Sequence, residues 1–232
     1  MEQIYTIPVN EAFEKCAVSG GCPFCELYSQ LDFNEIDLIL GASMMEPDVR
    51  KKTNEMGFCA DHFESLFAAG KKLPLALILE SHLKEVEGLV SSPGLMPAVA
   101  GASAAKKLGE ATCSCYICSR IEYNFSRMLQ TAAYLWETDE DFRRKCKGQE
   151  GYCIPHFSRF VSAAKSRMKS KTFAEFYRGV YATEEKHISG ISDKLSRFVK
   201  SFDYRYANEP IEDARDAVEK TIKLISGREV KR

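Results

Sequence analysis

The sequence predicts an all-α fold made of two tandem helical modules. Three observations support this prediction. No stretch shows the alternation of apolar and polar residues, rich in β-branched side chains, that marks a half-buried strand. Glycine and proline divide the chain into segments of helical length. One pattern of cysteine and histidine occurs twice in the same order, which indicates an internal duplication.

The repeated pattern is a CxxC pair followed by a glycine, an aromatic residue and a CxxH pair. The first copy has Cys22 and Cys25, then Cys59 and His62. In the second copy the CxxC pair comes 93 residues later and the CxxH pair 94 residues later, at Cys115, Cys118, Cys153 and His156. The repeat predicts a first helical zinc module at 1–90, a linker at 91–112, a second zinc module at 113–203, and an amphipathic helix with a basic tail at 204–232.

Proline and glycine also predict the helices of the first module. Pro23 suits the first turn of a helix that runs to about residue 40. Pro47 opens a short helix, and a third helix covers about residues 60–69 before Gly70. Pro74 opens a fourth helix that continues to about residue 90.

The second module is expected to follow the same order. Residues 91–112 are rich in glycine, serine, alanine and proline, so we expect a linker there. A helix then covers about residues 121–136, and residues 138–141 (TDED) form a capping box for a short helix. A long segment follows from about 171 to 202. Residues 208–210 (NEP) open a last helix, whose apolar face is expected at Ile211, Val218, Ile222 and Ile225.

Composition limits the classes of function. The chain has 232 residues, 45% of them hydrophobic, and a net charge of −1, so it can bury a core and has no excess of positive charge for nucleic acid or a membrane surface. The first residues lack the apolar run of a signal peptide, and no apolar stretch approaches the length of a membrane span. We therefore expect a cytoplasmic protein. Clustered cysteines in that reducing compartment indicate metal binding or catalysis.

Zinc explains the whole repeated pattern. Two thiolates from CxxC, with one thiolate and one imidazole from CxxH, complete a tetrahedral Cys3His site. We expect one Zn²⁺ ion in each module and two per chain. The predicted ligands are Cys22, Cys25, Cys59 and His62 for the first ion and Cys115, Cys118, Cys153 and His156 for the second. Four protein ligands leave no position for water, so both sites are predicted to be structural, and no catalytic residue is assigned.

Other interpretations of the cysteines stay open. Residues 22–25 (CPFC) could be a redox dithiol, but such a motif needs a preceding strand and has no use for a repeated CxxH. Buried free thiols and an iron–sulfur cluster are further alternatives. Cys113 could replace Cys115 as a ligand, although the 93-residue offset favours Cys115. Cys16 and Cys146 lie outside the pattern, and His82 and His187 are expected to be core or surface histidines.

The motifs also resemble a known group. A CPxC pair, an Asp-apolar-Arg segment and a G(F/Y)CxxH motif are similar to those of uncharacterised bacterial proteins, largely from anaerobic Firmicutes, that carry a domain-of-unknown-function label. The matching positions are Cys22, Pro23, Cys25, Asp48, Arg50, Gly57, Cys59 and His62, and in the second copy Cys115, Cys118, Asp141, Phe142, Arg143, Gly151, Cys153 and His156. The resemblance implies a helical metal-binding protein and supplies no activity.

The expected function is therefore non-enzymatic: a regulatory or interaction module that binds a protein partner. One alternative is a redox-responsive zinc switch, in which oxidation of the thiolates ejects the metal. Another is a thiol–disulfide oxidoreductase. A third is a nucleic-acid-binding regulator, for which the basic residues at 165–171 and 228–232 provide some clustering of positive charge.

Overall fold

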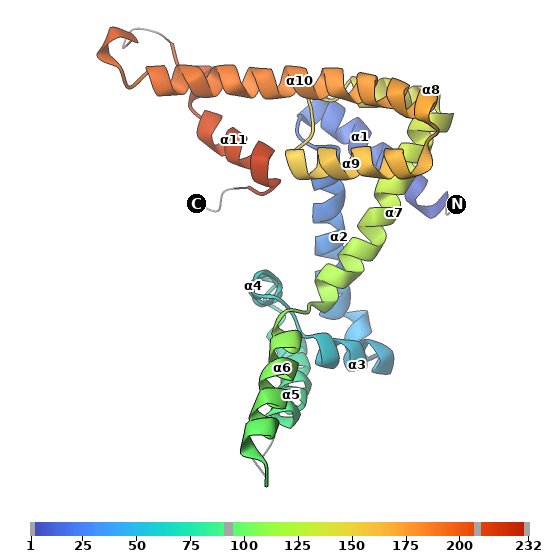
Figure 1. Cartoon of the computed structure of the whole chain (residues 1–232), viewed down its shortest axis with the longest axis vertical. Helices are drawn as coiled ribbons and strands as arrows, with labels where there is room; N and C mark the ends of the chain where they lie inside the picture. Colours follow the sequence, from blue (N-terminus) through green and yellow to red (C-terminus); the bar gives the residue numbers. More distant parts are fainter. Residues whose placement is uncertain (1–2, 91–94, 207–209, 230–232) are drawn as a thin grey trace. The chain divides into compact units, whose positions relative to one another are not determined.

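The computed structural model describes residues 3–90, 95–206 and 210–229 (Figure 1). Every regular element in these ranges is helical, which confirms the all-α prediction. The chain forms two compact units: unit 1 contains Met1–Ser29 and Phe125–Arg232, and unit 2 contains Gln30–Asn124. Each unit takes residues from both sequence modules, whose boundaries stay a prediction. None of the described helices has the length and apolar character needed to cross a membrane.

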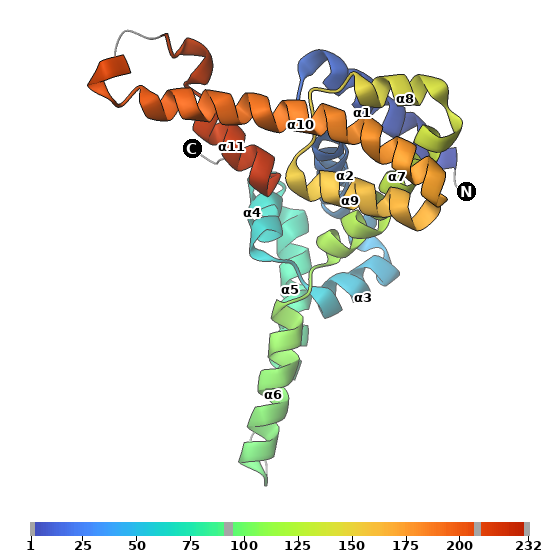
Figure 2. The ribbon, with the colours of Figure 1, turned by 45° about the horizontal axis from the view of Figure 1, so that its top comes forward.

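Unit 1 is a bundle around the long helix α10. It contains α1 (Thr6–Ser19), the start of α2 (Pro23–Ile39), the last turns of α7 (Tyr116–Thr138), α8 (Glu140–Lys147), α9 (Ile154–Arg167), α10 (Ser170–Lys200) and α11 (Ala217–Ser226). Helices α8, α9 and α11 all contact α10, while α1 packs on α8 and α11 also contacts α9 (Figures 1 and 2). Short 3-10 turns occupy Gln3–Tyr5, Tyr204–Tyr206 and Glu212–Ala214.

An aromatic cluster forms the core of unit 1. Phe24, in the first turn of α2, is fully buried. Its ring centroid lies 5.4 Å from that of Phe13 in α1, 4.9 Å from that of Phe160 in α9 and 5.8 Å from that of Tyr152. Edge-to-face and tilted contacts of this kind add to the stabilisation from apolar burial. The core therefore lies directly against residues 22–25.

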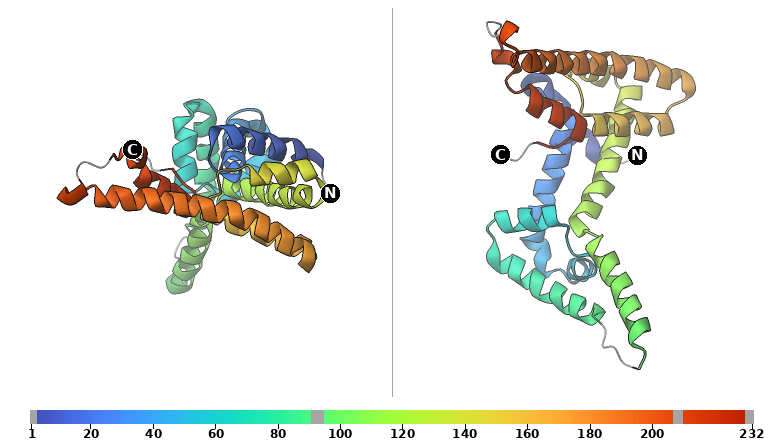
Figure 3. Two further views of the ribbon diagram at one scale, coloured as in Figure 1. Left: turned by 90° about the horizontal axis from the view of Figure 1, so that it is seen from above. Right: turned by 60° about the vertical axis from the view of Figure 1, so that its left-hand side comes forward.

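Unit 2 is built around α5. It contains the rest of α2 and of α7, a 3-10 turn at Ala42–Met45, α3 (Pro47–Met56), α4 (Ala60–Ala68), α5 (Lys72–Leu89) and α6 (Pro97–Thr112). Helices α4 and α5 form a hairpin (Figure 3, right), and α3 and α6 also contact α5. Arg50 in α3 donates to the Leu77 carbonyl at 2.6 Å, and Arg120 pairs with the buried Glu35 at 3.2 Å.

Most helices begin close to the positions that proline and glycine predict. Pro23 and Pro47 each stand at the start of a helix, where the missing N–H costs no hydrogen bond. The cap of α8 is Asp139 rather than the first residue of the predicted capping box, and its side chain accepts from the Asp141 and Phe142 amides. Helices α7 and α8 start 93 residues after α2 and α3, and α9 starts 94 residues after α4. These recurring starts match the offsets of the sequence repeat.

Two elements differ from the prediction. Residues 97–112 of the expected linker form helix α6, because alanine favours a helix and Pro97 stands at its first turn. Helix α11 begins at Ala217, and it buries Ala217 and Leu224 while Ile222 and Ile225 are exposed. Three predicted parts lie outside the described residues: the start of the linker (91–94), the start of the last helix (208–209) and the end of the basic tail (230–232).

We expect Phe24→Ala to lower the free energy of unfolding of unit 1 by about 3–5 kcal/mol, because it leaves a cavity in the aromatic core. Phe33→Ala is the matched control, since Phe33 lies in the same helix and is 70% exposed. Urea unfolding of the metal-loaded chain, followed by circular dichroism, measures both changes. Equal losses in the two variants would contradict the central role of Phe24.

Two candidate metal centres

The structure gathers the eight predicted ligands into two groups of four. Cluster 1 contains Cys22, Cys25, Cys153 and His156, all in unit 1. Cluster 2 contains Cys59, His62, Cys115 and Cys118, all in unit 2. Within each cluster one ligand atom from every residue lies within 4.8 Å of the others. Each cluster therefore offers three sulfur donors and one imidazole nitrogen at the spacing that one ion needs.

The prediction that each module binds its own ion is wrong about which pairs meet. The CxxC pair of the first copy meets the CxxH pair of the second copy, and Cys25 and Cys153 are 128 residues apart in the sequence. The CxxH pair of the first copy meets the CxxC pair of the second, with His62 and Cys115 53 residues apart. Because both copies carry the same motifs, this exchange leaves each donor set unchanged. Motif spacing therefore cannot reveal the pairing.

Helix starts position all eight ligands. Cys22 and Cys115 directly precede α2 and α7, and the second cysteine of each CxxC pair lies in the first turn. Cys59 directly precedes α4, and Cys153 directly precedes α9. The histidine three residues after each cysteine lies on the same face of its helix. Free N–H groups and the positive end of the helix dipole at these starts favour thiolates over thiols.

Donor distances in cluster 1 fit a tetrahedral ion. His156 Nδ1 lies 3.8 Å from Cys22 Sγ, 3.3 Å from Cys25 Sγ and 3.2 Å from Cys153 Sγ. The Cys25 and Cys153 sulfurs are 3.6 Å apart. Tetrahedral zinc would place sulfur donors about 3.8 Å from one another and about 3.5 Å from a nitrogen donor. The residues present therefore suit such an ion.

Cluster 2 has the same geometry. His62 Nδ1 lies 3.1 Å from Cys59 Sγ and 3.3 Å from both Cys115 Sγ and Cys118 Sγ. The sulfurs of Cys59 and Cys118 are 3.8 Å apart. All nine cysteines of the chain are free, so neither CxxC pair forms a disulfide. The two clusters thus present matched donor sets.

Main-chain hydrogen bonds also join the exchanged segments. In unit 2, the Tyr116 amide donates to the Gly57 carbonyl at 3.0 Å and the Ser114 hydroxyl donates to the Met56 carbonyl at 2.6 Å. In unit 1, the Gly21 amide donates to Glu150 Oε2 at 3.1 Å. Gly21 has a φ of 91°, a left-handed conformation that favours glycine. The pairing of segments therefore does not depend on the ligand atoms alone.

The two ligand histidines have different neighbours. His62 Nε2 lies 2.8 Å from Asp32 Oδ1, so a carboxylate orients the ring and favours Nδ1 as the donor atom to a metal. Phe125 follows Asp32 by the repeat offset of 93 residues. Its ring centroid lies 5.0 Å from that of His156. The ligand histidine of cluster 2 is thus contacted by a carboxylate, and that of cluster 1 by an aromatic ring. Nothing in the motifs indicated either neighbour.

Two histidines outside the motifs explain the glycines inside them. A Cβ at Gly57 would lie 2.8 Å from the His82 ring, and a Cβ at Gly151 would lie 2.2 Å from the His187 ring. Glycine is therefore needed for close approach at both positions. Gly57 also has a positive φ of 58°, whereas Gly151 is not among the glycines with positive φ. His82 Nδ1 also contacts the Asn54 carbonyl at 2.8 Å.

Proton equilibria show how strongly the thiols of cluster 1 interact. Hydrogen bonds from Cys22 and Cys25 stabilise the Cys153 thiolate and hold its pKa well below the usual range. The hydrogen bond with Cys153 in turn raises the pKa of Cys25 to about 12. Protons therefore compete for the sulfurs that a metal needs, and a divalent cation would displace them.

Cluster 2 behaves in the same way. Burial opposes ionisation of Cys115, but hydrogen bonds from His62 and from the Cys118 amide outweigh it and lower the pKa of Cys115 to about 6. Burial and the neighbouring Cys115 raise the pKa of Cys118 to about 12. One sulfur in each cluster thus ionises easily and another keeps its proton.

The remaining cysteines take no part in either cluster. Cys115 and not Cys113 is the member of cluster 2, and Cys113 is exposed. Cys16 and Cys146 are buried, and burial raises the pKa of each thiol. Helix α11 supplies a contact that the sequence did not indicate, because a Cβ at Gly227, just after that helix, would lie 3.2 Å from Cys153 Sγ.

The exchanged pairing predicts which thiols a histidine variant releases. We expect His62→Ala to make Cys115 and Cys118 reactive while Cys22 and Cys25 stay protected, because the latter pair belongs to cluster 1. His156→Ala is the matched variant and should release Cys22 and Cys25. Brief alkylation of the zinc-loaded variants, followed by peptide mass spectrometry, identifies the reactive thiols. The reverse assignment would show that each module binds its own ion.

The carboxylate beside His62 predicts a difference between the centres. We expect Asp32→Asn to weaken zinc binding at cluster 2 by about 10–100-fold, the usual effect of removing such a partner. Cluster 1 should keep its affinity. Asp37→Asn is the control, because Asp37 lies in the same helix and pairs with Lys71. Competition with a colorimetric zinc chelator resolves the two ions. An equal effect of both variants would mean that Asp32 does not support the ligand.

Comparison with known proteins gives one match. No curated protein and no solved structure matches the chain. A family model described as a family of unknown function (DUF6062) matches residues 1–232. The expected resemblance to a domain-of-unknown-function family is confirmed at that level, and the chain belongs to this family of unknown function.

Proposed function

We propose that this chain is a non-enzymatic zinc-binding protein in which each of two structural Cys3His sites holds together the segments of one helical unit. The observation that carries the proposal is the presence of two clusters, each with three sulfurs and one Nδ1 within the reach of one ion. Catalytic zinc sites have three protein ligands and leave a position for water. Each cluster here supplies four protein ligands, which is typical of a structural zinc site.

Zinc suits these donors better than the alternatives. Three thiolates and an imidazole in a tetrahedron favour zinc over harder cations, which prefer oxygen ligands. An iron–sulfur cluster spreads its thiolates over several irons, whereas all donors here lie within 4.8 Å of one another. A bound zinc ion would supply two positive charges to offset the three thiolates.

The structural role follows from which segments the ligands join. Cluster 1 links the start of α2 to the start of α9, and the N-terminal and C-terminal parts of unit 1 meet there. Cluster 2 links the start of α4 to the start of α7 in unit 2. Because the complete donor set exists only when these distant segments have come together, the free energy of zinc binding stabilises the folded unit. Internal duplication of the motifs, supported by the recurring helix starts, accounts for the matched donor sets.

A protein partner is the proposed ligand of the folded chain, which we place in the cytoplasm. Unit 2 exposes large apolar side chains in α4 and α5, including Phe67, Leu73 and Leu83. Exposed apolar side chains of this kind favour a protein surface over nucleic acid as the partner. A redox switch could use the thiols outside the clusters, Cys16 and Cys113. Cys16 is buried, which weakens that alternative, while Cys113 is exposed.

Metal content tests the proposal directly. We expect two zinc ions per chain by elemental analysis, and X-ray absorption should show three sulfur and one nitrogen neighbours for each ion. Removal of zinc by a chelator should lower helicity and the unfolding temperature, because the apparent binding energy of a structural site is about 10–16 kcal/mol. A chain that stays fully folded without metal, or that binds fewer than two ions, would contradict the structural role.

A further inference from the structure

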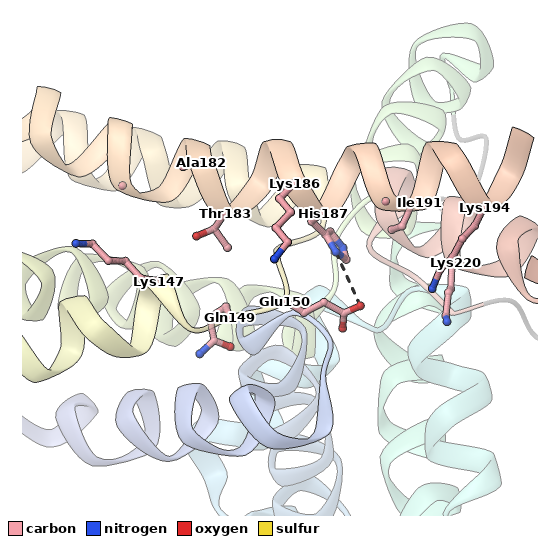
Figure 4. A pocket seen from close by; sticks show the side chains of 12 residues that line it. Lys147, Gln149, Glu150, Ala182, Thr183, Lys186, His187, Ile191, Lys194 and Lys220 are labelled. Atoms are coloured by element: carbon pink, nitrogen blue, oxygen red, sulfur yellow. Dashed lines mark ion pairs between the residues drawn. The ribbon is translucent and has the colours of Figure 1, made fainter. Parts of the chain in front are cut away.

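A cavity of about 570 Å³ lies along α10 in unit 1 (Figure 4). The segment that follows α8 and one residue of α11 complete its walls. Small residues of α10, namely Gly179, Ala182 and Gly190, keep it open. A second cavity of about 330 Å³ shares His187 and Lys220 with it and reaches the cysteines of cluster 1. The first volume falls in the range of sites for small organic ligands.

The charge of the larger cavity is positive. Four lysines line it, Lys147, Lys186, Lys194 and Lys220, and Glu150 is the only acidic lining residue. Glu150 accepts a hydrogen bond from the Gly21 amide at 3.1 Å and lies 4.0 Å from His187 Nδ1, as the dashed line in Figure 4 shows. Burial lowers the pKa of His187 and so favours its neutral form. The carboxylate is therefore already engaged, and the lysines dominate.

Most of the lysine charge is not neutralised by the protein. Lys147, Lys186 and Lys194 form no ion pair with any residue that the structure describes. Lys220 pairs with Asp216 at 2.9 Å. The hydrogen bond with Arg197 at 2.6 Å lowers the pKa of Asp213, and the hydrogen bond with Lys220 lowers that of Asp216. The charge of Lys194 makes a smaller contribution to both shifts. Several ammonium groups facing one cavity repel one another, so an anionic ligand would relieve them.

The lysines form two groups along the cavity. Lys186 and Lys194 are eight residues apart on α10, which corresponds to about 12 Å along a helix. Figure 4 shows the Lys194 and Lys220 side chains together on one side of His187 and Lys186 on the other. A ligand with a negative group at each end matches this arrangement. No arginine lines the cavity, and lysine binds phosphate as a point charge without the planar fork that carboxylates favour.

We propose that this cavity binds a small organic molecule with a phosphate group at each end. Lys194 and Lys220 hold one phosphate, Lys186 holds the other, and Thr183 offers a hydroxyl in the same cavity (Figure 4). The site is independent of the proposed zinc-dependent role, although its smaller neighbour reaches cluster 1. Metal content is therefore measured in every variant of the test.

Fructose 1,6-bisphosphate is a suitable probe, with fructose 6-phosphate as its single-phosphate counterpart. Calorimetry on the full metal-loaded chain at constant ionic strength should give at least about tenfold tighter binding for the bisphosphate, a difference of ~1.4 kcal/mol. Lys186→Ala/Lys194→Ala should weaken bisphosphate binding by about tenfold or more, because each phosphate loses an ammonium group. Citrate, at the same ionic strength, tests whether carboxylates bind equally well.

The control variant is Lys171→Ala/Arg178→Ala, which removes the same charge from exposed positions of α10 outside the cavity. It should change the bisphosphate affinity by less than about twofold, since exposed charges act weakly at a distance in salt. Equal weakening in both variants would show that binding reflects net charge alone. Equal affinities for the two sugar phosphates, equal binding of citrate, or no binding of the bisphosphate would each overturn the proposal.

Discussion

Three thiol groups and an imidazole crowded around one point are the constraint on which each unit depends. The hydrogen bond with Cys153 raises the pKa of Cys25 to about 12, and burial together with the neighbouring Cys115 raises the pKa of Cys118 to about 12. Close packing of these groups is stable when a cation replaces their protons. The aromatic core of unit 1 begins one residue from this point, since Phe24 lies between Cys22 and Cys25. Core packing and ligand geometry are thus set by the same turn of α2.

Exchange of segments between the copies makes the two halves of the sequence interdependent. Each cluster needs a CxxC pair from one copy and a CxxH pair from the other. A chain divided at the expected linker would separate the donors of both clusters. The hydrogen bonds from the Tyr116 amide to the Gly57 carbonyl and from the Gly21 amide to the Glu150 carboxylate cross between the copies in the same way. Each unit therefore draws its donors from both halves of the sequence.

The sequence was sufficient for the donor residues and most helix boundaries, but not for their pairing or surroundings. Proline at positions 23 and 47 and the CxxC and CxxH spacings act locally, so their effect is visible in a few residues. Pairing is decided by contacts between residues 53 to 134 positions apart, for which identical motifs give no signal. The glycine before each CxxH pair is visible in the sequence as part of the repeated pattern. The reason that glycine is needed there is a histidine ring from a later helix, which is far away in sequence. Glycine and serine led to the prediction of a linker at 91–112. The alanines of 97–112 favour the helix that forms there.

The two centres share a donor set and differ in electrostatic environment. At cluster 2, the Asp32 carboxylate lies 2.8 Å from His62 Nε2 and makes the imidazole a more basic ligand. At cluster 1, aromatic rings surround His156, and the positive charge of Lys223 acts on Cys25 and lowers its pKa against the larger opposing effect of Cys153. An ammonium group near thiolates offsets their charge and makes them weaker donors, whereas a carboxylate behind a histidine strengthens that ligand. Equal motifs therefore need not mean equal metal affinity, because residues outside the motifs determine how much charge the metal has to balance.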